Sequence, residues 1–333
     1  DTDFNTELGS DASAITQVHA LPDGRLLVAG TFRSLLGVVQ PYLARLSPNT
    51  RAATTHLSNL SVRARASTGA DTLIAGFVTQ RGTSSLLARG VGPALATFGV
   101  TSPLNDPQLA LYAGPTLLAT NDDWGSGPAE LLATTAARVG AFPLPADGAD
   151  AALHTSASAG SFTVHLTGKG AATGVALVEL YSTGPAPTAA TSPRVINFSV
   201  RTRAGTGADT LIAGFTITGD NTRNILLRAV GPALAPFGIS DSLPDPVLTL
   251  YRDDHAIATN DDWALNTTIW LSLKEAFATV GAFPLSSTAN ASQLTSSRDA
   301  ALLISLAPGS YTVHVSGKTG ASGVALVEIY EVP

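Results

Sequence analysis

The sequence contains no cysteine and no methionine in 333 residues, and only 13% of its residues are charged. Without cysteine, disulfides and thiolate metal sites are excluded. The absence of methionine even at position 1 indicates a processed or trimmed form. No apolar run reaches the roughly 18 to 20 residues that a membrane-spanning helix needs, so we expect no membrane span.

The charge that is present is slightly acidic and thinly spread, with a formal net charge of -6. No cluster of lysine or arginine could neutralise a phosphate backbone, so we expect no nucleic-acid partner. Hydrophobic residues make up 44% of the chain, enough for a large core, while 31 glycines and 20 prolines favour turns over long helices. A surface rich in threonine, serine and glycine but poor in lysine fits an exported protein.

The motifs of common catalytic sites are missing as well. There is no HExxH, GxSxG, GxGxxG or GxxxxGK[ST], so zinc hydrolysis, a serine nucleophile and a phosphate-binding loop are unsupported. His165 and His314 are the only histidines at matching positions of an internal repeat, and we interpret them as solvated residues on the polar face of strands. We therefore expect no enzymatic activity.

What the sequence does contain is a tandem duplication. The segments GADTLIAGF, VGPALA, ATNDDW, VGAFPL, DAAL and GVALVE each occur twice, in the same order. They define copy 1 at residues 57–182 and copy 2 at residues 195–333. A linker rich in Pro, Thr and Ala joins the copies at residues 183–194. Residues 1–50 form a separate β unit.

Each copy is predicted to be a β-sandwich. In SFTVHLTGK (residues 161–169) and SYTVHVSGK (310–318) apolar and polar residues alternate strictly, as in strands with one buried face. Similar segments give about eight short strands per copy, which suits a sandwich or jelly roll. We expect KGAATG and KTGASG to close hairpins, and one helix to follow each ATNDDW. The fold class is all-β, with two tandem sandwich domains after a short blade-like unit.

ATNDDW is the most polar repeated motif, and its interpretation stays open. In one interpretation it is a turn, whose Asn and Asp bond to the backbone or cap the following helix while the tryptophan enters the core edge. In another, its oxygens bind calcium, completed by Asp106 or Asp245 and by Asp150 or Asp299. A catalytic carboxylate pair is a third possibility, with no partner acid or base nearby. The candidate calcium ligands are Asn121, Asp122 and Asp123 in copy 1 and Asn260, Asp261 and Asp262 in copy 2.

An arginine and a glutamate also recur on predicted strands. Arg89 and Glu179 of copy 1 match Arg228 and Glu328 of copy 2. In a chain so poor in charge, we interpret them as ion pairs across a sheet. A face that binds glycan hydroxyls is the alternative, although aromatic residues are only 6% of the chain and form no evident platform.

Two family resemblances follow from longer segments. FN at residues 4–5, PDGRLLVAGTF at 22–32 and LARL at 43–46 resemble a delta-60 repeat, a propeller-blade-like unit of secreted and surface bacterial proteins. TLIAGF, RAVGPALAPFGI, LYRDDHAIATNDDW and PGSYTVHVSGKTGASGVALVEIY resemble C-terminal modules of exported bacterial proteins. The last segment is similar to pre-peptidase C-terminal domains, which are jelly-roll-like. These resemblances imply an extracellular or cell-surface β protein without catalytic activity.

A single blade buries little core and leaves strand edges open. We therefore predict a non-enzymatic structural or adhesive protein that assembles head-to-tail with itself, its N-terminal unit adding a strand to the next subunit. The alternative is an accessory module of a larger secreted protein that binds carbohydrate or cell-surface glycan. Calcium is the one candidate cofactor.

Overall fold

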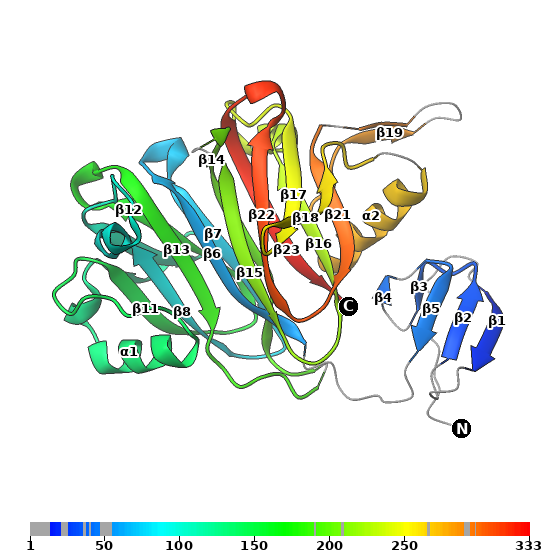
Figure 1. Cartoon of the computed structure of the whole chain (residues 1–333), viewed down its shortest axis with the longest axis horizontal. Coiled ribbons are helices and arrows are strands. Elements are labelled where there is room, and N and C mark those ends of the chain that lie inside the picture. The colour runs from blue at the N-terminus through cyan, green and yellow to red at the C-terminus, as the bar shows by residue number, and fades with distance from the viewer. Residues whose placement is uncertain are drawn as a thin grey trace.

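The computed structural model describes residues 14–20, 26–35, 38–39, 41–46, 55–189, 191–207, 210–264, 267–289, 294–296 and 298–333. Two antiparallel eight-stranded sheets pack face to face, and a three-stranded sheet lies at the N-terminal end of the molecule (Figure 1). The all-β class predicted from the alternation of apolar and polar residues is confirmed. No helix in the described part of the chain is long and apolar enough to cross a membrane.

The N-terminal unit is a small sheet in the order β1-β2-β5, with β1 (Ile15–Ala20), β2 (Leu26–Gly30) and β5 (Leu43–Leu46). A two-stranded ribbon of β3 (Ser34–Leu35) and β4 (Val38–Val39) accompanies it. Its buried apolar residues are Val28, Phe32 and Ala44, a core far smaller than that of the sandwich. The FN pair and the PDG turn of the sequence prediction lie outside the described residues.

The sandwich strands belong to the two copies in equal number, eight each, as predicted. Those of copy 1 are β6 (His56–Ala66), β7 (Leu73–Gln80), β8 (Ser84–Val91), β9 (Pro107–Ala113), β10 (Thr116–Asn121), β11 (Ala151–Ala157), β12 (Gly160–Gly168) and β13 (Gly174–Ser182). Those of copy 2 are β14 (Arg194–Ala204), β15 (Leu211–Thr218), β16 (Arg223–Val230), β17 (Pro246–Arg252), β18 (His255–Asn260), β21 (Ala300–Leu306), β22 (Gly309–Gly317) and β23 (Gly323–Val332). The longer loop of copy 2 carries a further hairpin, β19 (Ser287–Ala289) and β20 (Leu294–Ser296).

The two copies do not stand side by side as closed units, because their sheets join edge to edge. The first sheet runs β10-β9-β12-β7-β14-β23-β16-β21 and the second runs β11-β8-β13-β6-β15-β22-β17-β18. In the first, β7 of copy 1 pairs with β14 of copy 2, and in the second, β6 pairs with β15. Since β6 and β7 correspond to β14 and β15, the junction is the same on both sides, as in an isologous dimer.

One hydrophobic core lies between the sheets and continues through the junction. Its members include Phe162, Val164 and Leu166 of β12, while Thr163 and His165 on the opposite side of that strand are only half buried. Tyr311, Val313 and Val315 of β22 are buried in the same way. The period-two pattern read from the sequence therefore gave the correct inward faces.

The predicted hairpins after β12 and β22 are wrong. β12 belongs to the first sheet and β13 to the second, and β22 and β23 are likewise split between sheets. The KGAATG segment is a corner that crosses the core edge through a short 3-10 turn, η4 (Lys169–Ala171). The strands on either side of this segment both point apolar residues into the core. Two strands with this pattern can lie next to each other in one sheet or face each other from opposite sheets, so the pattern alone does not distinguish the two arrangements.

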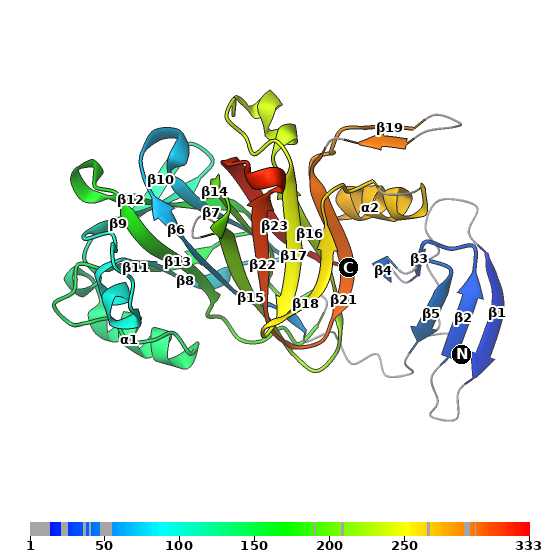
Figure 2. The same ribbon diagram turned by 45° about the horizontal axis from the view of Figure 1, so that its top comes forward.

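Helices cover the outer faces of the sandwich at its two ends, where α1 and α2 are seen in Figures 1 and 2. α1 (Ala129–Arg138) contacts β8 and β11 of the second sheet, and α2 (Thr267–Val280) contacts β21 and β23 of the first. Both follow ATNDDW, as predicted. Strands covered on both faces lose their alternation, which is why β8 and β16 are almost wholly buried.

Candidate functional site

The ATNDDW motif ends an edge strand in each copy and forms a turn. Nδ2 of Asn121 donates to the carbonyl oxygen of Asp123 at 3.0 Å, and its Oδ1 accepts from the backbone N–H of Ala152 at 2.8 Å. Asn260 makes the equivalent two bonds in copy 2, both at 2.9 Å. Both polar atoms of each asparagine side chain therefore hold the turn and anchor the following strand.

The helix cap predicted for this motif is wrong in copy 1, and in copy 2 the residues directly before α2 lie outside the described ranges, whereas the tryptophan plug is confirmed in both copies. A short turn, η3 (Trp124–Ser126), separates the motif from α1, whose N-cap Pro128 makes no side-chain cap hydrogen bond. The indoles of Trp124 and Trp263 are buried with the apolar residues beneath the two helices. In copy 1 the indole Nε1–H donates to the carbonyl oxygen of Pro145 at 2.9 Å.

The DAAL aspartates join three of the repeated motifs. Asp150 is fully buried, its backbone oxygen accepts from Trp124 N–H at 2.8 Å, and its Oδ1 accepts from Gly92 N–H at 2.8 Å. Asp299 repeats both bonds in copy 2. A Cβ on Gly92 would come within 2.0 Å of a backbone oxygen, so only glycine fits there. The repetition of VGPALA, ATNDDW and DAAL follows from this shared corner.

The first aspartate of each ATNDDW motif forms an ion pair with a lysine. Nζ of Lys169 lies 3.1 Å from Asp122 and 3.5 Å from Asp106, and Nζ of Lys318 lies 2.7 Å from Asp261. Hydrogen bonds from these lysines lower the pKa of Asp122 and of Asp261. The lysine ammonium of copy 1 thus stands between two of the carboxylates proposed as calcium ligands.

The structure brings some of the candidate ligands together but gathers no complete set of acids. Asp123 and Asp262 follow in the chain, and burial raises the pKa of Asp262. Asp245 pairs with Arg298 at 3.4 Å, and its negative charge also raises the pKa of Asp262 in the motif. No three His, Cys, Asp or Glu residues in the described ranges are grouped so that they could hold a metal. Calcium binding at ATNDDW stays a prediction.

The recurring arginine and glutamate do pair across a sheet. Arg89 of β8 lies opposite Glu179 of β13, with Nε 3.4 Å from Oε2, and Glu179 also accepts a 2.7 Å hydrogen bond from the hydroxyl of Tyr181. Arg228 and Glu328 repeat the pair at 3.2 Å. All four charged residues are buried on the outer, helix-covered face. Burial raises the pKa of both glutamates, while each arginine opposes that rise.

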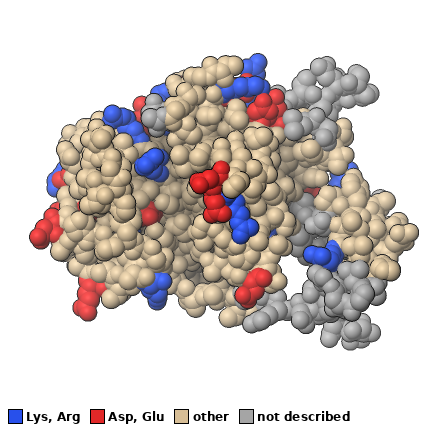
Figure 3. Space-filling model, in the orientation of Figure 1, with Lys and Arg blue, Asp and Glu red and all other residues tan. Residues whose placement is uncertain are grey.

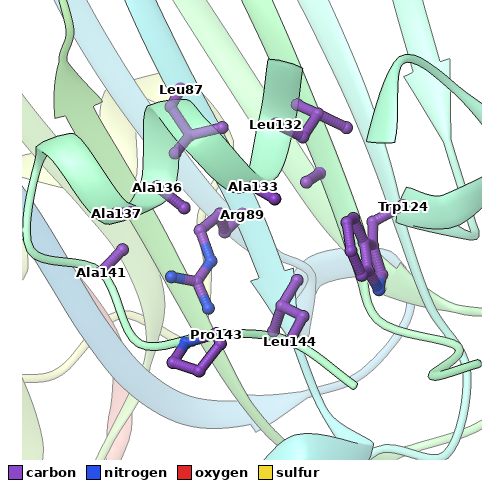
Figure 4. Close-up of a pocket in the computed structure, with 11 residues that line it drawn as sticks. Leu87, Arg89, Trp124, Leu132, Ala133, Ala136, Ala137, Ala141, Pro143 and Leu144 are labelled. Carbon is purple, nitrogen blue, oxygen red and sulfur yellow. The ribbon is translucent and has the colours of Figure 1, made fainter. Parts of the chain in front are cut away.

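A cavity of about 250 Å³ lies between α1 and the second sheet, beside Arg89. Its wall is apolar, and Figure 4 shows the guanidinium among side chains from α1, β8 and residues 141–144. The lining residues are Leu87, Arg89, Trp124, Leu132, Ala133, Ala136, Ala137, Ala141, Pro143, Leu144 and Ala152. Nη1 and Nη2 of Arg89 have no hydrogen-bond partner in the structure, and the same holds for Arg228 in copy 2.

Copy 2 places an aromatic ring where copy 1 has this space. Aligned through VGAFPL, Phe277 of α2 corresponds to Ala136 of α1. The Arg228 guanidinium lies between two rings, 4.6 Å from the centroid of Phe277 and 4.5 Å from that of Phe283. In copy 1, Phe142 corresponds to Phe283, and its ring centroid lies 4.5 Å from the Arg89 guanidinium. The other face of the Arg89 guanidinium has no ring, because Ala136 stands where copy 2 has Phe277.

The matching histidines are not simply solvated. His165 is half buried, with its ring centroid 4.6 Å from that of Tyr112, and His314 lies 4.4 Å from Tyr251. Burial lowers the pKa of both imidazoles. They face the outside of different sheets and form no catalytic group with one another.

Sequence reasoning missed the cavity, although a signal for it exists. Comparing the two copies residue by residue shows Phe277 against Ala136 in otherwise similar helices, a large loss of volume at one position. Only the structure shows that this position lies over a buried arginine. On the face seen in Figure 3, acidic and basic residues are mixed, with no broad patch of one sign.

Comparison with known proteins gives limited matches. A family model described as a domain of unknown function (DUF5122) beta-propeller matches residues 21–49. No curated protein matches the chain. A solved structure of a DUF4785 family protein from Legionella pneumophila is similar over 84% of each chain at 11% identity, with a TM-score of 0.20, too low to support an argument. The chain is thus similar to a propeller-related family over its N-terminal unit.

Proposed function

We propose that this chain is a non-enzymatic structural or adhesive module of an exported bacterial protein, with its N-terminal sheet as a connector. One observation carries the proposal: β1, an outer strand of that sheet, pairs on one side only within the described residues. Outer strands offer backbone N–H and C=O groups to an added strand. The side chain of Val18 on β1 is 58% exposed.

The match to a beta-propeller family supports the same role. Propeller blades are normally flanked by other blades, and the delta-60 resemblance and the similarity to pre-peptidase C-terminal domains both belong to secreted bacterial proteins. The edge-to-edge joining of the copies supplies a single stiff body behind the connector. A homopolymer of such bodies would be a filament on or outside the cell.

A second function, glycan or cell-surface binding by an accessory module, is favoured by two exposed rings. Phe98 and Phe237 occupy matching positions after VGPALA and are 63% and 62% exposed. Each packs edge-on against a second phenylalanine, at 4.9 Å and 5.0 Å between centroids. Exposed aromatic rings supply contact area at small entropic cost. A glycan array tests this function separately.

The connector is tested by negative-stain electron microscopy and sedimentation velocity of the chain at micromolar concentration. We expect filaments or regular oligomers that disappear on removal of residues 1–50, while the sandwich retains its circular dichroism and melting transition. Val18→Lys should weaken assembly as well, because a lysine on an edge strand opposes strand addition.

The matched control is Leu117→Lys, on sandwich edge strand β10, whose side chain is 52% exposed. This variant should assemble like the parent chain. Discrete 33.9 kDa particles of the unaltered chain would overturn the connector role. Assembly that survives the truncation would place the contact elsewhere.

A further inference from the structure

The space beneath α1 is a binding site with a definable ligand. We propose that the cavity beside Arg89 binds a small aromatic carboxylic acid of about ten non-hydrogen atoms, with the carboxylate on the guanidinium and the ring against the apolar wall. This inference goes beyond the connector role and does not depend on it. The argument uses size, polarity, and the internal comparison with copy 2.

Size limits the ligand. An engineered apolar cavity of about 150 Å³ holds one benzene molecule, so a cavity of about 250 Å³ has room for a ring with a short substituent. The wall is formed by leucine, alanine and tryptophan side chains, and Leu87 and Leu132 are almost fully buried. An apolar wall with few polar groups is typical of small-molecule sites.

Polarity limits the ligand further. Arg89 is only 1% exposed, and its ion pair with Glu179 lies on the Nε side at 3.4 Å. Nη1 and Nη2 have no acceptor, as is also true of Arg228 in copy 2, and a buried donor without an acceptor is unfavourable. In copy 1 a cavity adjoins the guanidinium, so a ligand there can supply the acceptor. The indole N–H of Trp124, the other polar group of the wall, is already bonded to Pro145. A carboxylate matches the two guanidinium donors.

Copy 2 shows which shape fits the open face of the arginine. There the ring of Phe277 lies on the guanidinium of Arg228 and 5.4 Å from the ring of Trp263. A ligand ring in the corresponding space of copy 1 would lie against the apolar wall near Trp124, with its carboxylate at the Nη1 and Nη2 edge of Arg89. Copy 2 thus fills this position with the ring of Phe277, whereas copy 1 leaves it open at Ala136.

The cavity has an entrance. Ala133 and Ala137 of α1 and Pro143 of the following segment line it and are exposed, whereas Leu87, Arg89 and Ala152 at its base are buried. Small side chains at the mouth give a planar molecule a path between the helix and the segment. In copy 2, Lys274 stands in place of Ala133, with Nζ 4.5 Å from the centroid of Trp270.

Binding is measured by titrating the full chain, labelled with ¹⁵N at its tryptophans, with benzoate and with phenylacetate. The chain has three tryptophans, so each indole N–H gives its own signal. We expect the Trp124 signal to shift saturably while that of Trp263, in the filled copy, stays in place. Toluene, which has only the ring, and acetate, which has only the carboxylate, should bind at least about tenfold more weakly.

Ala136→Phe is the decisive variant, because it installs the ring that copy 2 already carries. It should fold, and it should weaken benzoate binding by at least about tenfold. Equal affinity of parent chain and Ala136→Phe, or no Trp124 shift with either acid at millimolar concentration, would overturn the proposal. Toluene binding as tightly as benzoate would overturn the role of Arg89. Removal of residues 1–50 should leave the affinity unchanged, whatever the fate of assembly.

Discussion

Copy 1 and copy 2 bury the same ion pair beneath a helix, but only copy 2 covers both faces of its arginine with rings. Arg228 lies between Phe277 and Phe283, whereas Arg89 has Phe142 on one face. The corner that holds ATNDDW is built alike in both. The duplication has therefore kept the framework and changed the space above it, so a shared framework does not imply a shared function.

The largest effect is expected from Arg228→Leu. Glu328 would remain buried without its cation, a loss of about 3 to 5 kcal/mol in the free energy of unfolding. Burial already raises the pKa of Glu328, and loss of the arginine raises it further. In the folded variant this carboxyl therefore releases its proton at a higher pH than in the unfolded chain, where glutamate titrates near pH about 4.3. The loss in free energy of unfolding, relative to the parent chain, should therefore shrink as the pH falls from 7 toward 4. Urea unfolding across this pH range measures it.

Arg89→Leu is the matched variant in copy 1. Its cost should be smaller, because water entering the adjacent cavity can hydrate Glu179, whereas the rings of copy 2 keep water from Glu328. Equal losses in the two variants would mean that the cavity gives the ion pair no access to solvent. The comparison of an open and a sealed copy would then fail.

Phe277→Ala should come next, with a loss of about 3 kcal/mol through the cavity it leaves. The variant would give copy 2 the space that copy 1 has, next to Arg228 and Trp263. Thermal unfolding measures the loss, and the Trp263 indole signal should then respond to benzoate. A stable variant without a ligand response would show that the ring is not the feature that separates the copies.

The sequence predicted the parts of this fold that depend on local pattern. Alternation located β12 and β22 with their inward faces, and the spacing after ATNDDW located α1 and α2. It could not assign strands to sheets, since pairing across the junction, such as Phe77 opposite Phe198, joins residues far apart in the chain. The sequence predicts a hairpin at KGAATG because a short connection between two amphipathic strands has the same local pattern whether the strands share a sheet or lie in opposite sheets.

The candidate site divides in the same way. That ATNDDW forms a turn follows from Asn and Asp chemistry, and the pairing of Arg89 with Glu179 follows from the scarcity of other charges. The role of Asp150 could not be predicted, because its partner Gly92 lies in another motif. The cavity could not be predicted from copy 1 alone, because an alanine is ordinary at a helix position. Only the comparison with Phe277 of copy 2 indicates that side-chain volume has been lost at Ala136.

A moderate and equal effect is expected at the shared corner. Asp150→Ala and Asp299→Ala each leave buried backbone N–H groups of the VGPALA turn without their carboxylate acceptor, a loss of about 2 kcal/mol. Asp150→Asn keeps an oxygen acceptor and should lose less. Chemical unfolding of the three variants measures the losses. A clear inequality between the two alanine variants would show that the corner, too, has diverged.

The smallest effect is expected from Lys169→Met, because the lysine and Asp122 are exposed and salt screens such pairs. The variant should melt close to the parent chain at high salt. It also separates the two interpretations of ATNDDW, since the ammonium lies between Asp106 and Asp122, where a calcium ion would have to bind. Calcium should raise the melting temperature of Lys169→Met more than that of the parent, relative to chelator. An equal rise in both would mean that the lysine does not occupy the place of the ion, and the motif would then be a cation site in its own right.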